Sequence, residues 1–160
     1  MKIVLLDALT FGSTDLSGFD DLGEVVVYQT TSPEQTLERI TDANVIVTNK
    51  VVITKEMMSN AKELKLICVA ATGMNNVDLL AAEALHVEVK NVAGYSTDSV
   101  IQHTFSMLFY LMGHSRYYDE VVKDGTYSKS AIFTDVSQPF FEVKGKKWGI
   151  IGLGSIGRGV

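Results

Sequence analysis

A glycine motif near the end of the chain has the spacing of a phosphate-binding turn. Gly152, Gly154 and Gly157 directly follow a largely apolar run over residues 147–151. This order predicts a buried parallel strand that turns sharply into a helix. The first glycine permits the tight turn, the second lets the backbone approach a pyrophosphate, and the third lets the new helix pack on its strand. We therefore expect a dinucleotide at this turn; the alternative is a glycine-rich turn that binds no nucleotide.

The identity of the dinucleotide depends on residues that follow the motif. In such folds an acidic residue about 20 positions further on binds the adenosine ribose. The sequence ends at Val160, before that position. We expect NAD as the cofactor, and NADP is not excluded.

A second candidate site is the segment Thr72-Gly73, which follows an apolar run. Successive backbone N–H groups at such a turn form a nest for an anion such as a carboxylate. The alternative is that Gly73 only relieves backbone strain. Tyr95, in a later loop, is a candidate ligand contact. Three further polar residues are typical of a helix cap, which explains them without catalysis: Asn75, Asn76 and Asp78.

The histidines and the cysteine indicate structural roles. His86 and His114 lie near expected helix ends, where positive charge suits the helix dipole, and His103 lies on a helix expected to be buried. No paired metal ligands and no serine-elbow motif are present, so the sequence predicts no metal site and no covalent hydrolase chemistry. Cys68 is the only cysteine and is expected to be a small buried hydrophobe in a reducing, cytoplasmic setting.

Composition and charge exclude several classes of partner. The chain has 160 residues, 46% of them hydrophobic, with a net charge of −5, which is typical of a globular protein. Its Lys and Arg residues are scattered, so no nucleic-acid or membrane partner is expected. The most apolar helix candidate carries several polar residues and falls short of the roughly 20 apolar residues of a membrane span.

Short runs rich in Val and Ile alternate with helix-like stretches, which is the pattern of βα units around a parallel sheet. We expect an α/β fold with a flavodoxin-like sheet, followed by the first strand and glycine loop of a truncated Rossmann domain. The expected strands are residues 2–9, 24–28, 44–48, 64–71, 87–92 and 147–151. The expected helices are a short helix or turn over 15–23, and helices over 33–42, 54–63, 77–85 and from about 98 past Gly113 toward 123.

The helix expected from about residue 98 is apolar nearly all round. A helix without a polar face is buried on several sides, so we expect it to lie between two domains or two subunits. Its cap is expected at Thr97 or Asp98. Self-association as a homodimer follows as a prediction.

Three ordered segments, residues 69–79, 91–104 and 145–154, resemble successive signatures of the D-isomer-specific 2-hydroxyacid dehydrogenases. The resemblance covers essentially the whole chain. The Asn75-Asn76 pair and the stretch Tyr95 to Thr97 are most similar to the glycerate dehydrogenase, or hydroxypyruvate reductase, branch of that family.

The resemblance implies a hydride transfer between a nicotinamide and a small 2-oxo or 2-hydroxy acid. It implies that Thr72 and Gly73 receive the substrate carboxylate, that Thr72 also lies on the nicotinamide side, and that Tyr95 lines the substrate side. Gly152, Gly154 and Gly157 are then cofactor residues together with Ser155 and Ile156, which are implied to contact the pyrophosphate. The implied domains are a substrate domain (1–98), an interdomain or dimer helix (99–124), a linker (125–145) and the start of the cofactor domain (146–160).

Catalysis in the family uses an Arg and a His paired with a Glu, and no residue here matches them. We therefore expect the 160-residue chain to be inactive, as the N-terminal part of a longer enzyme. A non-enzymatic NAD-sensing or dimerising module related to the family is the alternative. A phosphoacceptor receiver domain is disfavoured, because it needs an acidic residue after the third strand and a lysine after the fifth, where this chain has Thr48-Asn49 and Asn91.

Overall fold

The computed structural model describes residues 1–160. They form two compact units, Met1–Tyr95 and Ser96–Val160.

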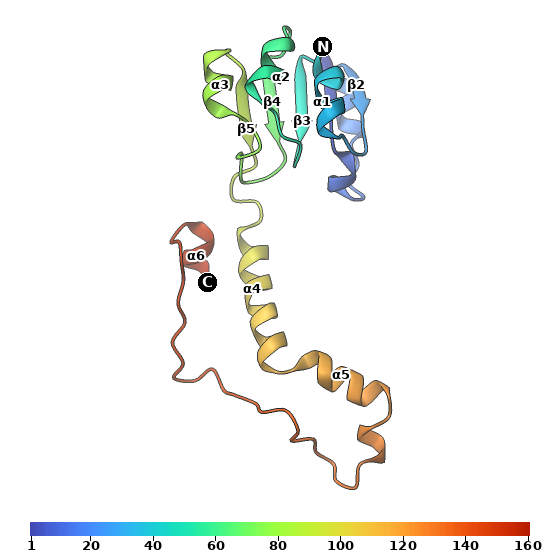
Figure 1. The fold of residues 1–160 in the computed structure, drawn as a ribbon, viewed down its shortest axis with the longest axis vertical. Helices are drawn as coiled ribbons and strands as arrows, with labels where there is room; N and C mark the ends of the chain where they lie inside the picture. Colours follow the sequence, from blue (N-terminus) through green and yellow to red (C-terminus); the bar gives the residue numbers. More distant parts are fainter. The chain divides into compact units, whose positions relative to one another are not determined.

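The first unit is a five-stranded parallel sheet with helices (Figure 1). The strand order is β2-β1-β3-β4-β5, so the expected flavodoxin-like α/β fold is confirmed. The chain runs through β1 (Lys2–Leu5), the 3-10 helices η1 (Ala8–Phe11) and η2 (Ser17–Leu22), β2 (Glu24–Val27), α1 (Pro33–Ile40), β3 (Val45–Thr48), α2 (Lys55–Asn60), β4 (Leu66–Val69), α3 (Leu79–Ala84) and β5 (Glu88–Asn91).

The two faces of this sheet carry different cores because side chains alternate along each strand. On one face, Val4, Ile46 and Ile67 pack with residues of α1, α2 and α3, and all three are fully buried. The opposite face has a smaller core around Leu5 and Val47, packed against residues of η1 and η2. The first face is therefore the better covered of the two.

Local sequence signals set the ends of the helices in this unit. The Ser32 capping box at the start of α1 is present, with Pro33 in the first helical position. Thr54 caps α2, where its hydroxyl accepts the N–H of Met57. Residues 6–9 and 70–71 lie outside β1 and β4, so these strands are shorter than predicted. The chain enters η1 at Ala8, although the N–H groups of Leu6 and Ala70 still donate to carbonyl oxygens of β3.

The second unit contains α4 (Thr97–Met112), α5 (Ser115–Lys123), the 3-10 helix η3 (Tyr127–Lys129) and α6 (Ser155–Gly159). The prediction of one helix through residue 123 is wrong, because the helix breaks after Met112. His114 takes a left-handed conformation there, with φ 48°, and glycine at 113 weakens a helix interior. The cap expected at Thr97 or Asp98 is also wrong: Ser96 is the N-cap, and it makes no side-chain capping bond.

The helix α4 is exposed within this unit: none of its residues is buried, and Phe109 and Leu111 are 55% and 71% exposed. That this helix lies between two domains or two subunits stays a prediction. His103 is exposed as well. The strand expected over residues 147–151 is not formed. A parallel strand needs a neighbouring strand for its hydrogen bonds, and the second unit contains no other strand.

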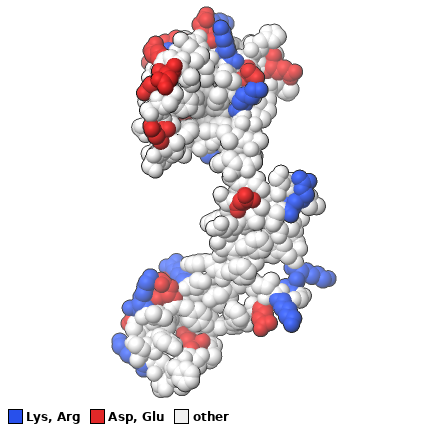
Figure 2. Space-filling model, turned by 180° about the vertical axis from the view of Figure 1, so that it is seen from behind, with Lys and Arg blue, Asp and Glu red and all other residues white.

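Acidic and basic side chains are interspersed on the face that Figure 2 presents. No helix of the structure combines the length and apolar character that crossing a membrane requires.

Candidate functional site

The loop after β4 offers unpaired backbone donors. The N–H groups of Thr72 and Gly73 donate to no acceptor in the chain, and both residues are exposed. The carbonyl oxygen of Thr72 accepts the Asn91 side-chain amide at 2.6 Å, and the Thr72 hydroxyl donates to the Val92 carbonyl at 3.4 Å. The loop is thus held by the end of β5 while two adjacent donors stay free for an anion.

The glycine in this loop is not explained by backbone strain. Gly73 is not among the residues with positive φ, so its conformation is open to any residue. A Cβ at this position would lie 3.2 Å from the Asn75 side-chain oxygen, which is a tight contact. The lack of a side chain keeps the two free N–H groups accessible.

The loop after β3 holds the loop after β4 in place. The Asn76 side-chain amide donates to the Val51 carbonyl at 3.0 Å, and the Ile53 N–H donates to the Asn76 carbonyl at 2.8 Å. Asp78 caps α3, as predicted, by accepting the N–H of Ala81 at 3.0 Å. The Asn75 side chain has no such role, and Asn76 binds the neighbouring loop instead of capping a helix.

A buried carboxylate that sequence reasoning did not single out anchors the loop after β3. Asp7 is 5% exposed and accepts the N–H of Asn49 and the N–H of Lys50, the latter at 2.6 Å. The available signal was a charged residue placed directly after the apolar run of the first strand. Such a residue lies at the carboxyl edge of the sheet, where flavodoxin-like folds hold ligands.

Tyr95 is 63% exposed and is the last residue of the first unit. The structure gives its hydroxyl no hydrogen bond, and no hydrogen bond joins Tyr95 to the Thr72 loop. Its role toward a substrate stays a prediction.

The glycine turn in the second unit has the geometry that its sequence predicts. Gly152 has a φ of +96°, a conformation that residues with a Cβ rarely adopt. A Cβ on Gly157 would collide with the Gly152 carbonyl oxygen, so the third glycine is required for the helix to approach the turn. Gly154 is the N-cap of α6, and space around it is open.

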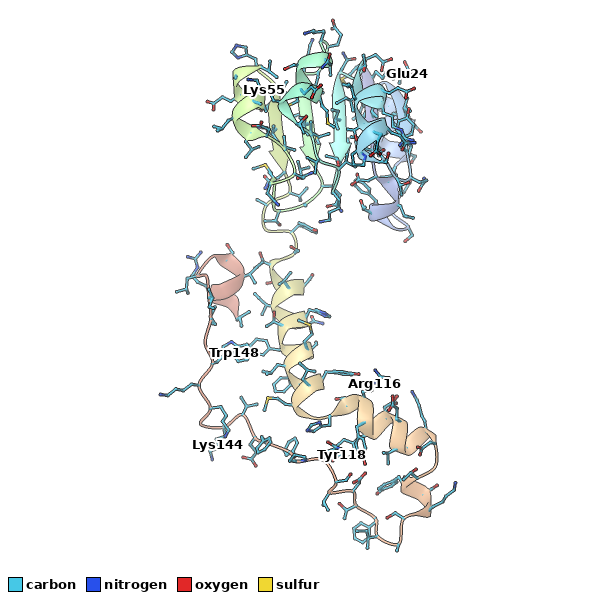
Figure 3. The ribbon with its side chains drawn as sticks, viewed as in Figure 1. Glu24, Lys55, Arg116, Tyr118, Lys144 and Trp148 are labelled. Atoms are coloured by element: carbon cyan, nitrogen blue, oxygen red, sulfur yellow. The ribbon has the colours of Figure 1, made fainter.

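The start of α6 presents free donors near this turn. Ser155 and Ile156 form its first turn, and their N–H groups make no hydrogen bond, as at any helix N-terminus. The indole of Trp148 stacks on Phe105 of α4, with ring centroids 6.2 Å apart. Figure 3 labels Trp148, which lies close to the turn in sequence. That the turn binds a pyrophosphate stays a prediction.

The structure places no three His, Cys, Asp or Glu side chains together in a way that would hold a metal ion. His86 and His114 both take left-handed conformations just beyond helix ends. The Nε2 atom of His114 lies 2.9 Å from the Pro139 carbonyl oxygen. This contact gives His114 a structural role, and the role of His86 stays a prediction.

Comparisons with known proteins show the family of the chain. The family model for the catalytic domain of D-isomer specific 2-hydroxyacid dehydrogenases matches residues 3–144. The chain is 35% identical over 163 residues to a hydroxypyruvate reductase of Blautia hydrogenotrophica, covering 99% of this chain and 51% of the relative. It is 32% identical over 160 residues to a glycerate dehydrogenase of Methylorubrum extorquens, covering 99% of this chain and 51% of the relative.

A solved structure extends the likeness to the fold. An acyclic imino acid reductase in complex with NADPH and D-Arg matches with a TM-score of 0.80 and 25% identity, covering 99% of this chain and 51% of that one. The chain spans about half the length of the curated relatives that it matches.

Proposed function

Because the chain belongs to the D-isomer-specific 2-hydroxyacid dehydrogenase family, we propose that it is the N-terminal part of an NAD(P)-dependent dehydrogenase. The reaction is hydride transfer between a nicotinamide and a small 2-oxo or 2-hydroxy acid. Hydroxypyruvate and glyoxylate are the substrates that we favour for reduction. The family match over residues 3–144 is the observation that carries this proposal.

The carboxylate of the acid is assigned to the loop after β4. Thr72 and Gly73 offer two adjacent N–H groups without partners, and donors that are already fixed in place bind an anion without a cost of ordering. Tyr95 is proposed to line the substrate side. The name hydroxypyruvate reductase of one relative supports a three-carbon acid as the substrate.

The cofactor is assigned to the glycine turn. The positive φ of Gly152 and the close approach at Gly157 let the backbone follow a pyrophosphate, while Gly154, Ser155 and Ile156 supply the N–H donors. A nicotinamide dinucleotide, when bound, supplies the hydride. We favour NAD; the NADPH complex of the structural relative keeps NADP open.

The proposed organisation assigns residues 1–98 to a substrate domain, 99–124 to an interdomain or dimer helix, 125–145 to a linker and 146–160 to the start of the cofactor domain. A cytoplasmic location is part of the same proposal. We propose that the Arg, Glu and His that the family resemblance implies for catalysis have no counterparts in residues 1–160. The 160-residue chain alone is therefore expected to show no dehydrogenase activity and weak or no NADH affinity.

The substrate assignment can be tested with two ligands of similar size. Hydroxypyruvate is expected to shift the amide resonances of Thr72 and Gly73, whereas dihydroxyacetone, which lacks the carboxylate, is expected to leave them unchanged. Gly73→Val is expected to abolish the shift by crowding the loop. Gly18→Val is the matched control, because nothing lies within 4 Å of a Cβ at Gly18. Equal responses to the two ligands would contradict the assignment.

The expected inactivity of the 160-residue chain is tested by fluorescence of Trp148, the sole tryptophan. Titration of the 160-residue chain with NADH is expected to give no saturation in the micromolar range. Absorbance at the reduced-nicotinamide band, followed with hydroxypyruvate present, is expected to stay constant. Micromolar saturation or turnover would contradict the expected inactivity of the chain.

An exposed apolar surface on α4 favours a second candidate function, a dimerising module. Met107, Phe109 and Leu111 are all more than half exposed, and exposed apolar surface of this kind marks an interaction site. Light scattering decides this candidate: a monomer mass at tens of micromolar would reject it. A dimer mass at this concentration, together with no shift of the Thr72 amide resonance by hydroxypyruvate, would favour the dimerising module over the enzyme.

A further inference from the structure

A cavity of about 460 Å³ lies at the carboxyl ends of β1, β2 and β3. The loop after β1 contributes Asp7, the loop after β2 contributes Thr31, and the loop after β3 contributes Lys50 and Val51. The cavity is therefore built entirely within the first unit. None of Thr72, Gly73 and Tyr95 lines it.

The position of this cavity is the one at which open parallel sheets bind ligands. β1 and β3 are neighbouring parallel strands, and the chain adds β2 on one side of β1 and β3 on the other. The loops that follow β1 and β3 therefore diverge to opposite sides and leave a crevice between them. In flavodoxin-like folds the ligand lies at this switch point. The proposed substrate loop instead follows β4, one strand further along the sheet.

The cavity is lined by one carboxylate, that of Asp7, and by one cationic side chain, that of Lys50, and the two form no ion pair. Asp7 accepts two backbone N–H groups, from Asn49 and Lys50, and a carboxylate has about four lone-pair positions. None of the ion pairs in the structure involves Asp7.

The remaining walls are mostly apolar. Leu9, Val51 and Met57 line the cavity, together with Pro33 from the first turn of α1. A volume of this size accommodates a small organic molecule. A buried acceptor with negative charge inside apolar walls is complementary to a cation that carries a short aliphatic body.

We propose that this switch-point cavity is a second ligand site, which binds a small primary ammonium compound with an aliphatic chain. The ammonium group donates to the Asp7 carboxylate, and the chain packs against Leu9, Val51 and Met57. Lys50 is exposed at the mouth and disfavours any longer cationic ligand. The site is separate from the proposed substrate loop, yet Val51 also accepts the Asn76 amide, so a bound ligand contacts the segment that holds that loop.

Three probes that share one aliphatic chain separate charge from apolar packing. The 160-residue chain is titrated with n-butylammonium, 1-butanol and butyrate, and amide resonances of Asp7, Thr31 and Val51 are followed. We expect n-butylammonium to bind about tenfold or more tightly than 1-butanol, since a hydrogen bond to a charged partner contributes about 1.5–3 kcal/mol. Butyrate is expected not to bind, because its charge repels that of Asp7.

Variants test the residues that the proposal names. Asp7→Asn is expected to remove the preference for n-butylammonium over 1-butanol. Because Asp7 also holds a loop, Leu9→Trp provides a second variant, in which an exposed residue at the mouth blocks entry. Lys50→Gln is expected to strengthen n-butylammonium binding a few-fold by removing a like charge. Asp42→Asn is the control, because Asp42 is an exposed carboxylate paired with Lys2 outside this cavity.

Two results would overturn the proposal: equal binding of the three probes, or n-butylammonium binding that Leu9→Trp leaves unchanged. Neither bears on the dehydrogenase proposal, which depends on the Thr72 loop and is tested with hydroxypyruvate. Conversely, a failure of hydroxypyruvate to shift Thr72 leaves the predicted ammonium preference intact.

Discussion

The two units of the chain differ in how far their apolar side chains are buried. In Met1–Tyr95, residues such as Val4, Ile46 and Ile67 are completely buried. In Ser96–Val160, Val121 is the only buried apolar residue, while Leu111 is 71% exposed. Both units have apolar sequences, so composition does not account for the difference. What differs is whether the unit contains a second layer for each element to pack against.

The glycine turn shows which features form without such a layer. Gly152 takes its positive φ and Gly157 approaches the Gly152 carbonyl, although the preceding residues 147–151 form no strand. Turn geometry depends on neighbours in sequence, whereas a parallel strand depends on a partner far along the chain. In this segment the turn, which needs only neighbours in sequence, is formed, and the parallel strand, which needs a distant partner, is not.

The largest expected difference between the units is in amide hydrogen exchange. Residues 147–151 take part in no backbone hydrogen bond, so their amides are expected to exchange at nearly the rate of an unfolded peptide. Amides of the β3–β4 pairing, such as that of Ile67, are expected to exchange orders of magnitude more slowly, because they open only with the sheet. Mass spectrometry or NMR of the chain in D₂O measures both. If the amides of residues 147–151 exchanged as slowly as those of β4, the expected difference between the two units would be contradicted.

A pair of core substitutions gives the next largest difference. Ile46→Ala removes a fully buried side chain and is expected to lower the free energy of unfolding of the first unit by about 2–5 kcal/mol. Leu111→Ala, on the exposed face of α4, is the matched control and is expected to change stability by within about 0.5 kcal/mol. Urea unfolding followed by circular dichroism measures both. A loss for Leu111→Ala as large as that for Ile46→Ala would show that α4 is covered in solution.

The same distinction explains what the sequence predicted. The five strands of the first unit were found because Val- and Ile-rich runs are paired with neighbours in the same unit, and the caps at Ser32, Thr54 and Asp78 were found because capping is local. The turn glycines were found for the same local reason.

Two failures have different causes. The strand expected at 147–151 needs a neighbouring strand that the pattern of one segment does not specify, whereas the helix expected through residue 123 ends at a local feature, the left-handed conformation of His114. Asp7 was not identified as a site residue, because its carboxylate accepts N–H groups from distant residues. The two donors, Asn49 and Lys50, lie more than 40 positions further along the chain. A sequence shows that a charged residue ends a strand, but the pairing appears only when β1 and β3 lie side by side.

Helix caps in the two units provide a third contrast, of about 1 kcal/mol. Asp78→Ala removes the side-chain acceptor of the Ala81 N–H and is expected to destabilise the first unit by about 1 kcal/mol. Ser96→Ala is the matched change at the start of α4, where the N-cap makes no side-chain bond, and is expected to have almost no effect. Thermal unfolding of the two variants compares them. A loss of helicity in Ser96→Ala would show that α4 gains a cap in solution.

The smallest contrast concerns Cys68, which lies on the less covered face of the sheet in the first unit and is half-buried. Burial raises the pKa of the Cys68 thiol above its ordinary value of 9.0, and the negative charge of Glu88 raises it further. A raised pKa leaves less of the nucleophilic thiolate at neutral pH. Reaction of Cys68 with a thiol reagent at pH 8 is expected to be several-fold slower than that of a cysteine introduced as Ser106→Cys on exposed α4, in a Cys68→Ser background.

The sign of the accompanying pH effect follows from the same shift. The folded chain retains the thiol proton at pH values where the unfolded chain has begun to release it, so the contribution of Cys68 to stability is complete below pH 9.0 and is lost as the pH rises above it. Glu88→Gln is expected to accelerate the reaction of Cys68 with the thiol reagent, but by less than unfolding of the chain does. The reason is that burial raises the pKa of Cys68 more than the charge of Glu88 does. Glu83→Gln, on α3, is the control. If Cys68 reacted as fast as the cysteine on α4, the second face of the sheet would be as open as the helix, and the contrast between the units would be limited to the face covered by α1, α2 and α3.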